Sequence, residues 1–296
     1  MNKIIQIACV SIVAAAGLGA SCRGIQDATR TVGRGVGGVG DVASIATGNL
    51  SASNKTGDYI ETGKVIFDTV RLEDADRERA IGESLAVSFT NSPGVDSRDA
   101  IQKYVISVGL TVASVVPRTD LVWTFGVLDT DDVAAYSAPQ GYVFVTRGAL
   151  SAMQNEAELA GVLAHEIAHV VKNHGMDTIK SQGYSKALMT GALAGYNSNQ
   201  VVDFLKDTTE TLRNSTYSQS QETSADALAI QYVAQAGYDA RGYAAFLSRL
   251  NDSPRKTFDT HPRTADRVAK VNALAGAHNG GVILADRFRQ NVALGK

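Results

Sequence analysis

The chain has 296 residues, of which 44% are hydrophobic and 20% are charged, and its formal net charge is −2. This composition is typical of a folded globular protein and excludes a disordered chain. The slightly acidic balance offers no basic surface for a phosphate backbone, so we expect no nucleic acid partner.

The first 21 residues predict a signal peptide. Met1, Asn2 and Lys3 precede a mostly apolar run over residues 4–20, in the usual order of an n-region and an h-region. Small residues then lead to Cys22, as in a lipoprotein cleavage box. We therefore expect a periplasmic protein of the bacterial envelope, anchored to the outer membrane by a lipid on Cys22. A freely soluble periplasmic product is the alternative.

The remaining chain divides into a tether and one domain. Residues 22–59 are rich in Gly, Ser, Thr and Asn and predict a flexible tether. Residues 60–296 suffice for one domain with a sizeable core. We predict an α+β, mainly helical domain that begins with two helices over residues 63–90 and 98–116. Nothing in the sequence sets the oligomeric state.

Two segments rich in β-branched and aromatic residues follow these helices, over residues 121–128 and 142–146. Pro139, Gln140 and Gly141 predict a turn just before the second segment. We expect a small antiparallel sheet that packs on the next helix. Its edge could bind an extended peptide as an added strand, or the hairpin could simply cover the core.

The sequence His165-Glu166-Ile167-Ala168-His169 carries the strongest functional signal. On a helix, two histidines four residues apart lie one turn above the other, so both rings can reach one metal ion. Glu166 is then placed to act as the general base toward a water molecule. The apolar residues on both sides of the motif indicate a buried helix.

A catalytic zinc site needs a third ligand, and neither cysteine belongs to the mature domain. His174 falls nearly opposite His165 around an extended helix, and we interpret it as a cation at the helix C-terminus. Residues 181–199 are loosely patterned and predict a mobile flap or helix beside the cleft.

Glu222 and Asp226 lie four residues apart on one face of a second apolar helix. Glu222 can supply the third ligand, and Asp226 can accept the outer N–H of a ligand histidine. A solvated acidic face is the alternative. Weaker competitors occur in a more polar stretch just before this helix: Asp203, Asp207 and Glu210.

Four sequence blocks in this order resemble the HtpX-like and CAAX-prenyl-protease-like zinc metallopeptidases, particularly their lipoprotein and periplasmic envelope members. The resemblance covers residues 60–275, and its blocks are residues 137–148, 165–169, 222–226 and 260–268. It implies a zincin-like (gluzincin) catalytic domain with a small antiparallel sheet beside the motif helix.

The resemblance also implies roles for individual residues. The zinc ligands would be His165, His169 and Glu222, with Glu166 as the catalytic base and Asp226 as a proton donor. His261 and Arg267 would lie near the metal, where they steady an oxyanion or cover the open coordination position.

These observations predict a metalloendopeptidase with one Zn²⁺ per chain. Its expected substrates are extended, misfolded or unassembled envelope proteins, cleaved by Glu-assisted attack of zinc-bound water. The alternative is a chaperone or assembly factor with the peptidase fold and a gated metal site, closed by His261. A metal-binding structural protein is a second alternative. A fourth protein ligand at the metal would favour either alternative.

Overall fold

The computed structural model describes residues 74–181, 210, 217–250, 261, 265–278 and 280–293. The predicted signal peptide and tether, the first eleven residues of the first predicted helix, and residues 182–199 of the predicted flap lie outside this part of the chain.

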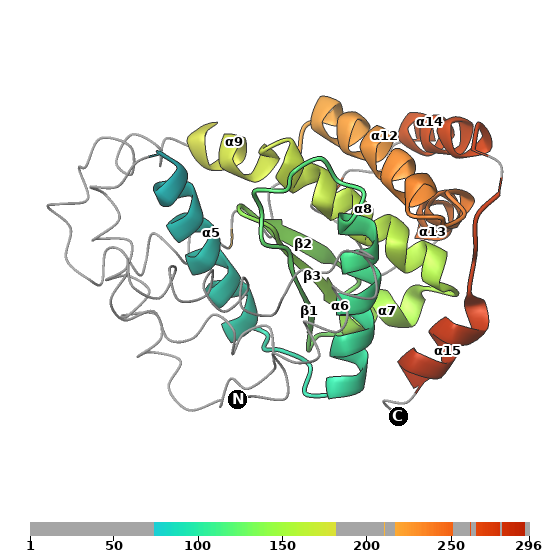
Figure 1. The fold of residues 1–296 in the computed structure, drawn as a ribbon, viewed down its shortest axis with the longest axis horizontal. Helices are drawn as coiled ribbons and strands as arrows, with labels where there is room; N and C mark the ends of the chain where they lie inside the picture. Colours follow the sequence, from blue (N-terminus) through green and yellow to red (C-terminus); the bar gives the residue numbers. More distant parts are fainter. Residues whose placement is uncertain are drawn as a thin grey trace, which may run out of the picture.

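The described residues form a mainly helical structure with one small sheet (Figure 1). In chain order the elements are α5 (Asp74–Asn91), α6 (Asp99–Ala113), β1 (Thr124–Leu128), β2 (Ala135–Ala138), β3 (Tyr142–Thr146), α7 (Arg147–Ala152), α8 (Glu156–Val171), α9 (His174–Ser181), α12 (Gln219–Gln235), α13 (Arg241–Leu250), α14 (Ala265–Gly276) and α15 (Ala285–Ala293). The break predicted after residue 90 is confirmed, because α5 ends at Asn91 and α6 begins at Asp99.

The sheet is mixed, so the prediction of an antiparallel sheet is wrong. Its strand order is β1-β3-β2; β1 pairs with β3 in parallel, and only β2 and β3 are antiparallel. The predicted turn is present, with positive φ angles of 67° at Gln140 and 97° at Gly141. The strand before the turn is β2, however, whose sequence Ala-Tyr-Ser-Ala lacks the β-branched residues that signal a strand. The chain reverses its direction between β1 and β2 and again between β2 and β3, so β1 and β3 run in the same direction.

Both faces of β3 are buried. Val143 and Val145 belong to the larger hydrophobic core together with residues of α6, α8, α12 and α13. Tyr142 and Phe144 point to a smaller core formed with α5 and α9. This alternation follows from the two-residue period of a strand, and it places the sheet between two helical layers.

Helix α8 lies between the sheet and the α12–α13 pair, as Figure 1 shows. Every residue from Glu156 to Val170 is buried, which agrees with the apolar pattern of the motif helix. Helix α13 comes close to α8 because Gly161 has no side chain; a Cβ there would lie 2.4 Å from the Cβ of Tyr243. This close approach brings Tyr243 beside the motif.

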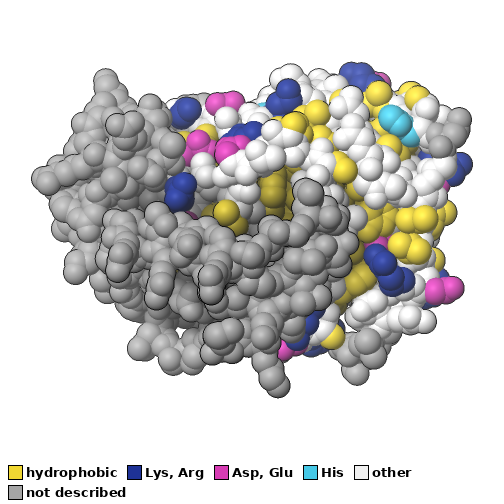
Figure 2. Space-filling view, in the orientation of Figure 1, with side chains coloured by type: hydrophobic (Ala, Val, Ile, Leu, Met, Phe, Trp, Pro, Cys, Tyr) yellow, Lys and Arg dark blue, Asp and Glu magenta, His cyan; other side chains and the backbone are white. Residues whose placement is uncertain are grey.

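On the face shown in Figure 2, the basic and acidic side chains of the described residues are interspersed among polar and apolar ones. The exposed large hydrophobic residues include Val122, Val282 and Ile283. Among the residues described, none of the helices has the length and the apolar run that crossing a bilayer requires.

Candidate metal centre

Helix α8 carries His165, Glu166 and His169 near its C-terminal end. Asn155 caps its N-terminus, where its side chain accepts the backbone N–H of Glu158. The two histidine rings lie one turn apart with centroids 4.6 Å from each other, and their Nε2 atoms are 3.0 Å apart. The predicted juxtaposition on one helix face is therefore present in the structure.

Helix α12 supplies two carboxylates to the same place. A capping box formed by Ser218 and Gln221 starts this helix, and Glu222 lies in its first turn. Glu222 Oε1 lies 3.4 Å from Nε2 of His169, and Asp226 Oδ1 lies 3.0 Å from Nδ1 of His165. The predicted pair thus faces the two motif histidines, with Glu222 at the inner nitrogens and Asp226 at an outer one. Of the weaker acidic competitors, Asp203 and Asp207 lie outside the described residues, and Glu210 is exposed.

His261 and Arg267 also reach the cluster. His261 Nδ1 lies 3.1 Å from Nε2 of His165 and 2.8 Å from Oε1 of Glu222. The Arg267 guanidinium forms ion pairs of 2.6 Å with both Glu222 and Asp226. It therefore holds the two carboxylates in position.

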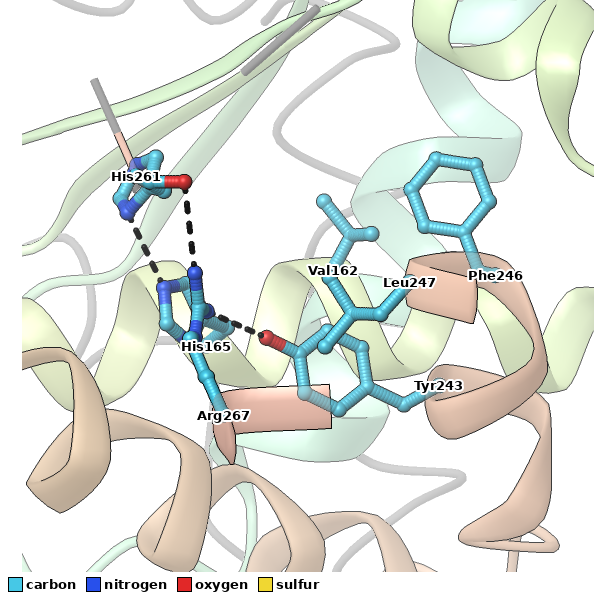
Figure 3. A pocket seen from close by; sticks show the side chains of 7 residues that line it. All are labelled: Val162, His165, Tyr243, Phe246, Leu247, His261 and Arg267. Carbon is cyan, nitrogen blue, oxygen red and sulfur yellow. Dashed lines mark hydrogen bonds between the residues drawn. The ribbon is translucent and has the colours of Figure 1, made fainter. Parts of the chain in front are cut away.

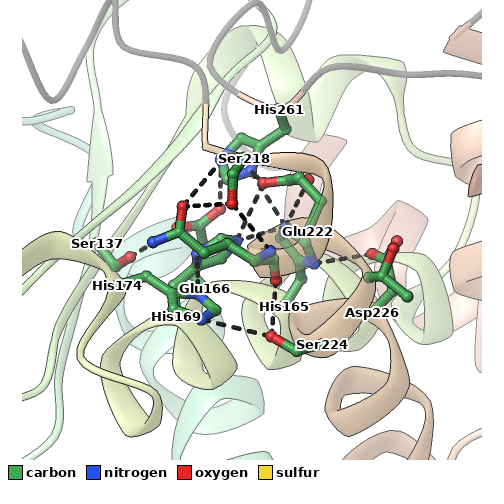
Figure 4. A network of polar contacts seen from close by, with 12 residues as sticks. Ser137, His165, Glu166, His169, His174, Ser218, Glu222, Ser224, Asp226 and His261 are labelled. Carbon is green, nitrogen blue, oxygen red and sulfur yellow. Dashed lines mark hydrogen bonds and ion pairs between the residues drawn. The ribbon is translucent and has the colours of Figure 1, made fainter. Parts of the chain in front are cut away.

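The residues present fit a metal ion. His165, His169, Glu222 and His261 are buried, and their candidate ligand atoms all lie within 4.8 Å of one another (Figure 4). Nε2 of His165 faces ring nitrogens of both other histidines, at 3.0 and 3.1 Å. Imidazole nitrogens and a carboxylate that converge in this way are suited to holding a metal cation between them. The described part of the chain thus contains a candidate metal centre.

The charges in the metal-free cluster follow from burial and mutual contact. Burial alone would lower the pKa of His261, but Glu222 and Glu166 outweigh it and raise this pKa to about 10. Burial would raise the pKa of Glu166, yet His261 and the motif histidines bring it down to about 2. The pKa of Glu222 is also lowered, since the charge of His261 and the hydrogen bond of His169 outweigh burial. The cluster is therefore an ionised pair of carboxylates with one compensating imidazolium.

The pKa values of His169 and Asp226 are also set by burial and by contacts within the cluster. Burial is the largest influence on His169 and lowers its pKa to about 3, so this ring is neutral and keeps a lone pair. Burial would raise the pKa of Asp226, but its hydrogen bond with Arg267 and its contact with His165 lower it. Asp226 is thus ionised and acts as an acceptor.

The sequence did not point to the contact between Glu166 and strand β2. The Ser137 hydroxyl donates a 2.9 Å hydrogen bond to Oε2 of Glu166, and His261 Nε2 lies 3.2 Å from Oε1. Tyr217 stacks on the His169 ring, with centroids 4.0 Å apart. No local pattern identifies Ser137 or Tyr217, because their proximity to the motif arises from packing between elements.

The interpretation of His174 as a cation at the C-terminus of the motif helix is wrong. Helix α8 ends at Val171, Asn173 adopts a left-handed conformation with φ 56°, and His174 begins α9. The reversal brings His174 Nδ1 to 2.9 Å from Nδ1 of His169, where burial lowers the pKa of His174. Asn173 was the available signal, since Asn commonly occupies the left-handed position that ends a helix.

An apolar pocket lies on the other side of His165. Figure 3 shows Val162 of α8 and Tyr243, Phe246 and Leu247 of α13 around it, with His261 and Arg267 at its polar side. The Tyr243 hydroxyl donates a 2.8 Å hydrogen bond to Asp226. The pocket is therefore continuous with the candidate metal centre.

Comparisons with known proteins give a consistent result. The family model described as Peptidase family M48 matches residues 99–275. The chain is 25% identical over 221 residues to the beta-barrel assembly-enhancing protease of Escherichia coli K12, covering 65% of this chain and 42% of that protein. It is 23% identical over 218 residues to the metalloprotease YcaL of the same organism, covering 72% of this chain and 85% of YcaL. It is 29% identical over 175 residues to the mitochondrial metalloendopeptidase OMA1 of Schizosaccharomyces pombe, covering 57% of this chain and 51% of that protein.

The length of these relatives differs from that of the present chain. The chain spans half or less of the length of the beta-barrel assembly-enhancing proteases that it matches, with coverage of 47% and 42% in two of them. The part of the chain that matches the family model, residues 99–275, contains all of the cluster residues from His165 to His261.

Proposed function

The chain belongs to peptidase family M48, and from this premise we propose that it is a zinc-dependent metalloendopeptidase. The observation that carries the proposal is the buried cluster of His165, His169, Glu222 and His261, with the Glu166 carboxylate beside it. A metal centre of this kind next to a carboxylate that is not one of the proposed ligands is suited to hydrolysis, whereas structural zinc sites are usually closed by four Cys or His ligands.

Zinc is proposed from the chemistry of the donors. Imidazole nitrogens with one carboxylate are typical of catalytic zinc, and the proposed ligands are His165, His169 and Glu222. When bound there, a zinc ion supplies Lewis-acid activation of a water molecule and of the peptide carbonyl. The remaining steps belong to side chains of the protein.

Glu166 is the proposed general base. Its carboxylate is buried and ionised, and the 2.9 Å hydrogen bond from Ser137 holds one of its oxygens. A carboxylate held in this way can take a proton from the attacking water and deliver it to the leaving amine. Because Ser137 belongs to β2, the base and the sheet edge are positioned together.

Asp226 and Arg267 are proposed to support the ligands. Asp226 lies at the outer nitrogen of His165 and can fix its orientation as an acceptor. The family resemblance implies a proton-donor role for Asp226, whereas its contacts with Arg267 and His165 support the positioning role proposed here. Arg267 is engaged with Asp226 and Glu222, so we assign it to positioning these carboxylates.

The proposed substrate is an extended peptide. Strand β2 is one of the two edge strands of the sheet formed by the described residues, and Ser137 links it to Glu166. Main-chain hydrogen bonds to such an edge bind many sequences, which suits unfolded proteins.

We further propose that the enzyme works in the bacterial envelope on misfolded or unassembled proteins. The names of the beta-barrel assembly-enhancing relatives support this location. The predicted signal peptide, the lipid anchor on Cys22, the tether and a catalytic domain over residues 60–296 are consistent with it. Mass spectrometry and membrane fractionation of the wild type and of Cys22→Ser test the anchor: an unmodified, unbound wild-type protein would remove it.

The central experiment compares casein cleavage by the purified wild type with cleavage by Glu166→Gln at equal zinc content. Cleavage by the wild type alone would establish both the peptidase activity and the role of the base. The Ser137→Ala variant is the matched control, because it removes the hydrogen bond to Glu166 and leaves the carboxylate itself in place; a partial loss is expected. Equal cleavage by the wild type and Glu166→Gln would contradict the assignment of the base.

A second candidate, a chaperone or assembly factor with a gated metal site, is favoured by one observation. His261 lies among the four potential ligands, and all four side chains are buried. A fourth protein ligand would exclude both water and substrate from the metal. The same residue could instead donate to an oxyanion once the substrate enters.

The His261→Ala variant separates these roles. If His261 gates the metal, casein cleavage should increase in His261→Ala and remain zinc-dependent. If His261 stabilises the oxyanion, cleavage should fall by roughly 10²–10³-fold. A wild type and a His261→Ala variant that both bind zinc and casein without cutting would favour the chaperone function.

A further inference from the structure

A network of polar contacts runs from His169 of the candidate metal centre through His174 to Ser224. Nδ1 of His174 lies 2.9 Å from Nδ1 of His169, and Nε2 of His174 lies 3.4 Å from the hydroxyl of Ser224. That hydroxyl donates a 2.9 Å hydrogen bond to the backbone carbonyl of Gln221. This network connects α8, α9 and α12, and Figure 4 shows the side chains of His169, His174 and Ser224 beside the cluster.

The Ser224 hydroxyl determines which atom donates and which accepts in each hydrogen bond of this network. Because the Ser224 hydrogen points to a carbonyl, the Ser224 oxygen is left to accept from Nε2–H of His174. A neutral imidazole has one N–H and one lone pair, so Nδ1 of His174 is then an acceptor. It can take the hydrogen bond of Nδ1–H of His169, and Nε2 of His169 keeps its lone pair toward the cluster.

This direction matters because a competing arrangement exists. Glu222 Oε1 lies 3.4 Å from Nε2 of His169 and attracts a proton to that nitrogen when no cation is bound. A metal ion requires the opposite tautomer, with the proton on Nδ1. Without an acceptor at Nδ1, this tautomer would leave a buried N–H without a partner, which is costly.

We propose that His174 is a positioning residue for the metal centre: with Ser224 it selects the metal-binding tautomer of His169. This inference rests on the proposed zinc site. Each motif histidine then has a partner at its outer nitrogen, Nδ1: Asp226 contacts that of His165, and His174 contacts that of His169. It also means that α9 contributes to zinc affinity although it supplies no ligand.

The test measures zinc affinity by competition with a chromophoric chelator, using the full chain. Four proteins are compared: the wild type, His174→Leu, His174→Asn and Met176→Leu. Leu removes the acceptor, whereas the side-chain oxygen of Asn can stand near the place of Nδ1. Met176 is a buried residue of α9 and belongs to the smaller core formed with α5. The Met176→Leu variant therefore controls for a disturbance of α9 itself.

We expect His174→Leu to bind zinc about 10- to 100-fold more weakly than the wild type. His174→Asn should recover most of this loss, and Met176→Leu should bind as the wild type does. Thermal unfolding of the metal-free proteins separates affinity from folding: the midpoint of His174→Leu should stay close to that of the wild type.

Wild-type affinity in His174→Leu, or equal losses in the Leu and Asn variants, would overturn the role of His174. Failure of the wild type to bind one zinc ion would instead overturn the proposed metal site, and the role of His174 with it. The two failures are therefore distinguished by the wild type alone.

Discussion

The two ends of helix α8 both bury ionisable side chains, but they do so in opposite ways. At the N-terminal end, the Glu156 carboxylate accepts hydrogen bonds from the hydroxyls of Tyr104 and Tyr238 at 2.8 and 2.7 Å. Arg287 of α15 forms an ion pair with the same carboxylate. At the C-terminal end, the ring nitrogens of His165 and His169 face each other at 3.0 Å.

The difference lies in the balance of donors and acceptors. Around Glu156 each carboxylate oxygen has donors, so the N-terminal end is complete and ties α6 and α15 to α8. Around His165 and His169 the candidate ligand atoms converge on one place, an arrangement that a bound metal ion would complete. Burial of charge alone therefore does not identify a functional site; the convergence of potential metal ligands does.

The largest expected effect is on metal binding, which should depend on the residues at the C-terminal end of α8 and not on those at its N-terminal end. Glu222→Ala removes a proposed ligand and should abolish stoichiometric zinc binding, and casein cleavage should fall by about 10³-fold because the Lewis acid contributes several kcal/mol. Glu156→Gln should keep one zinc ion per chain and most of the activity. Metal analysis and initial rates measure both. Zinc lost equally from both variants would mean that the two ends are not independent.

Zinc removal should affect stability through the C-terminal end only. At a free zinc concentration a thousand times its dissociation constant, binding contributes about 4 kcal/mol to the free energy of unfolding. Thermal unfolding with zinc and with a chelator measures this difference. Glu156→Gln should show the same difference, and Glu222→Ala should show almost none. An unchanged midpoint in the wild type would contradict a metal bound to the folded state.

Breaking the N-terminal network should cost stability without affecting chemistry. Glu156→Gln replaces a buried carboxylate that three residues contact, and we expect a loss of about 2–3 kcal/mol in the free energy of unfolding. This is below the usual cost of breaking a buried pair, because the Arg287 side chain is 50% exposed. Urea unfolding of the metal-free variant provides the measurement. A loss below about 0.5 kcal/mol would remove the proposed structural role.

The smallest effects come from a matched pair of hydroxyl deletions. Tyr104→Phe and Tyr243→Phe each remove one hydrogen bond to a buried carboxylate, Glu156 and Asp226 respectively. Each should cost about 1 kcal/mol of stability. Only Tyr243→Phe should also weaken zinc binding, by up to about tenfold, because Asp226 supports His165. Equal zinc affinities in the two variants would show that this support does not depend on Tyr243.

The sequence by itself determined the parts of the site that lie on single helices. His165 and His169 share a helix face because four residues make about one turn, and the same geometry aligns Glu222 with Asp226. Apolar flanks predicted that the motif helix is buried, and the structure agrees. The approach of His261 and Arg267 to the cluster came from a family resemblance and not from any local pattern.

Only the tertiary structure decided which elements meet. The strand β2 lacks β-branched residues and was not predicted; its pairing with β3 and its packing on α8 bring Ser137 to Glu166. His174 reaches His169 because the chain reverses at Asn173, and the hydroxyls of Tyr104 and Tyr238 meet Glu156 through helix packing. Spacing within a helix is set by backbone geometry, whereas contacts between elements depend on how their side chains fill the core together.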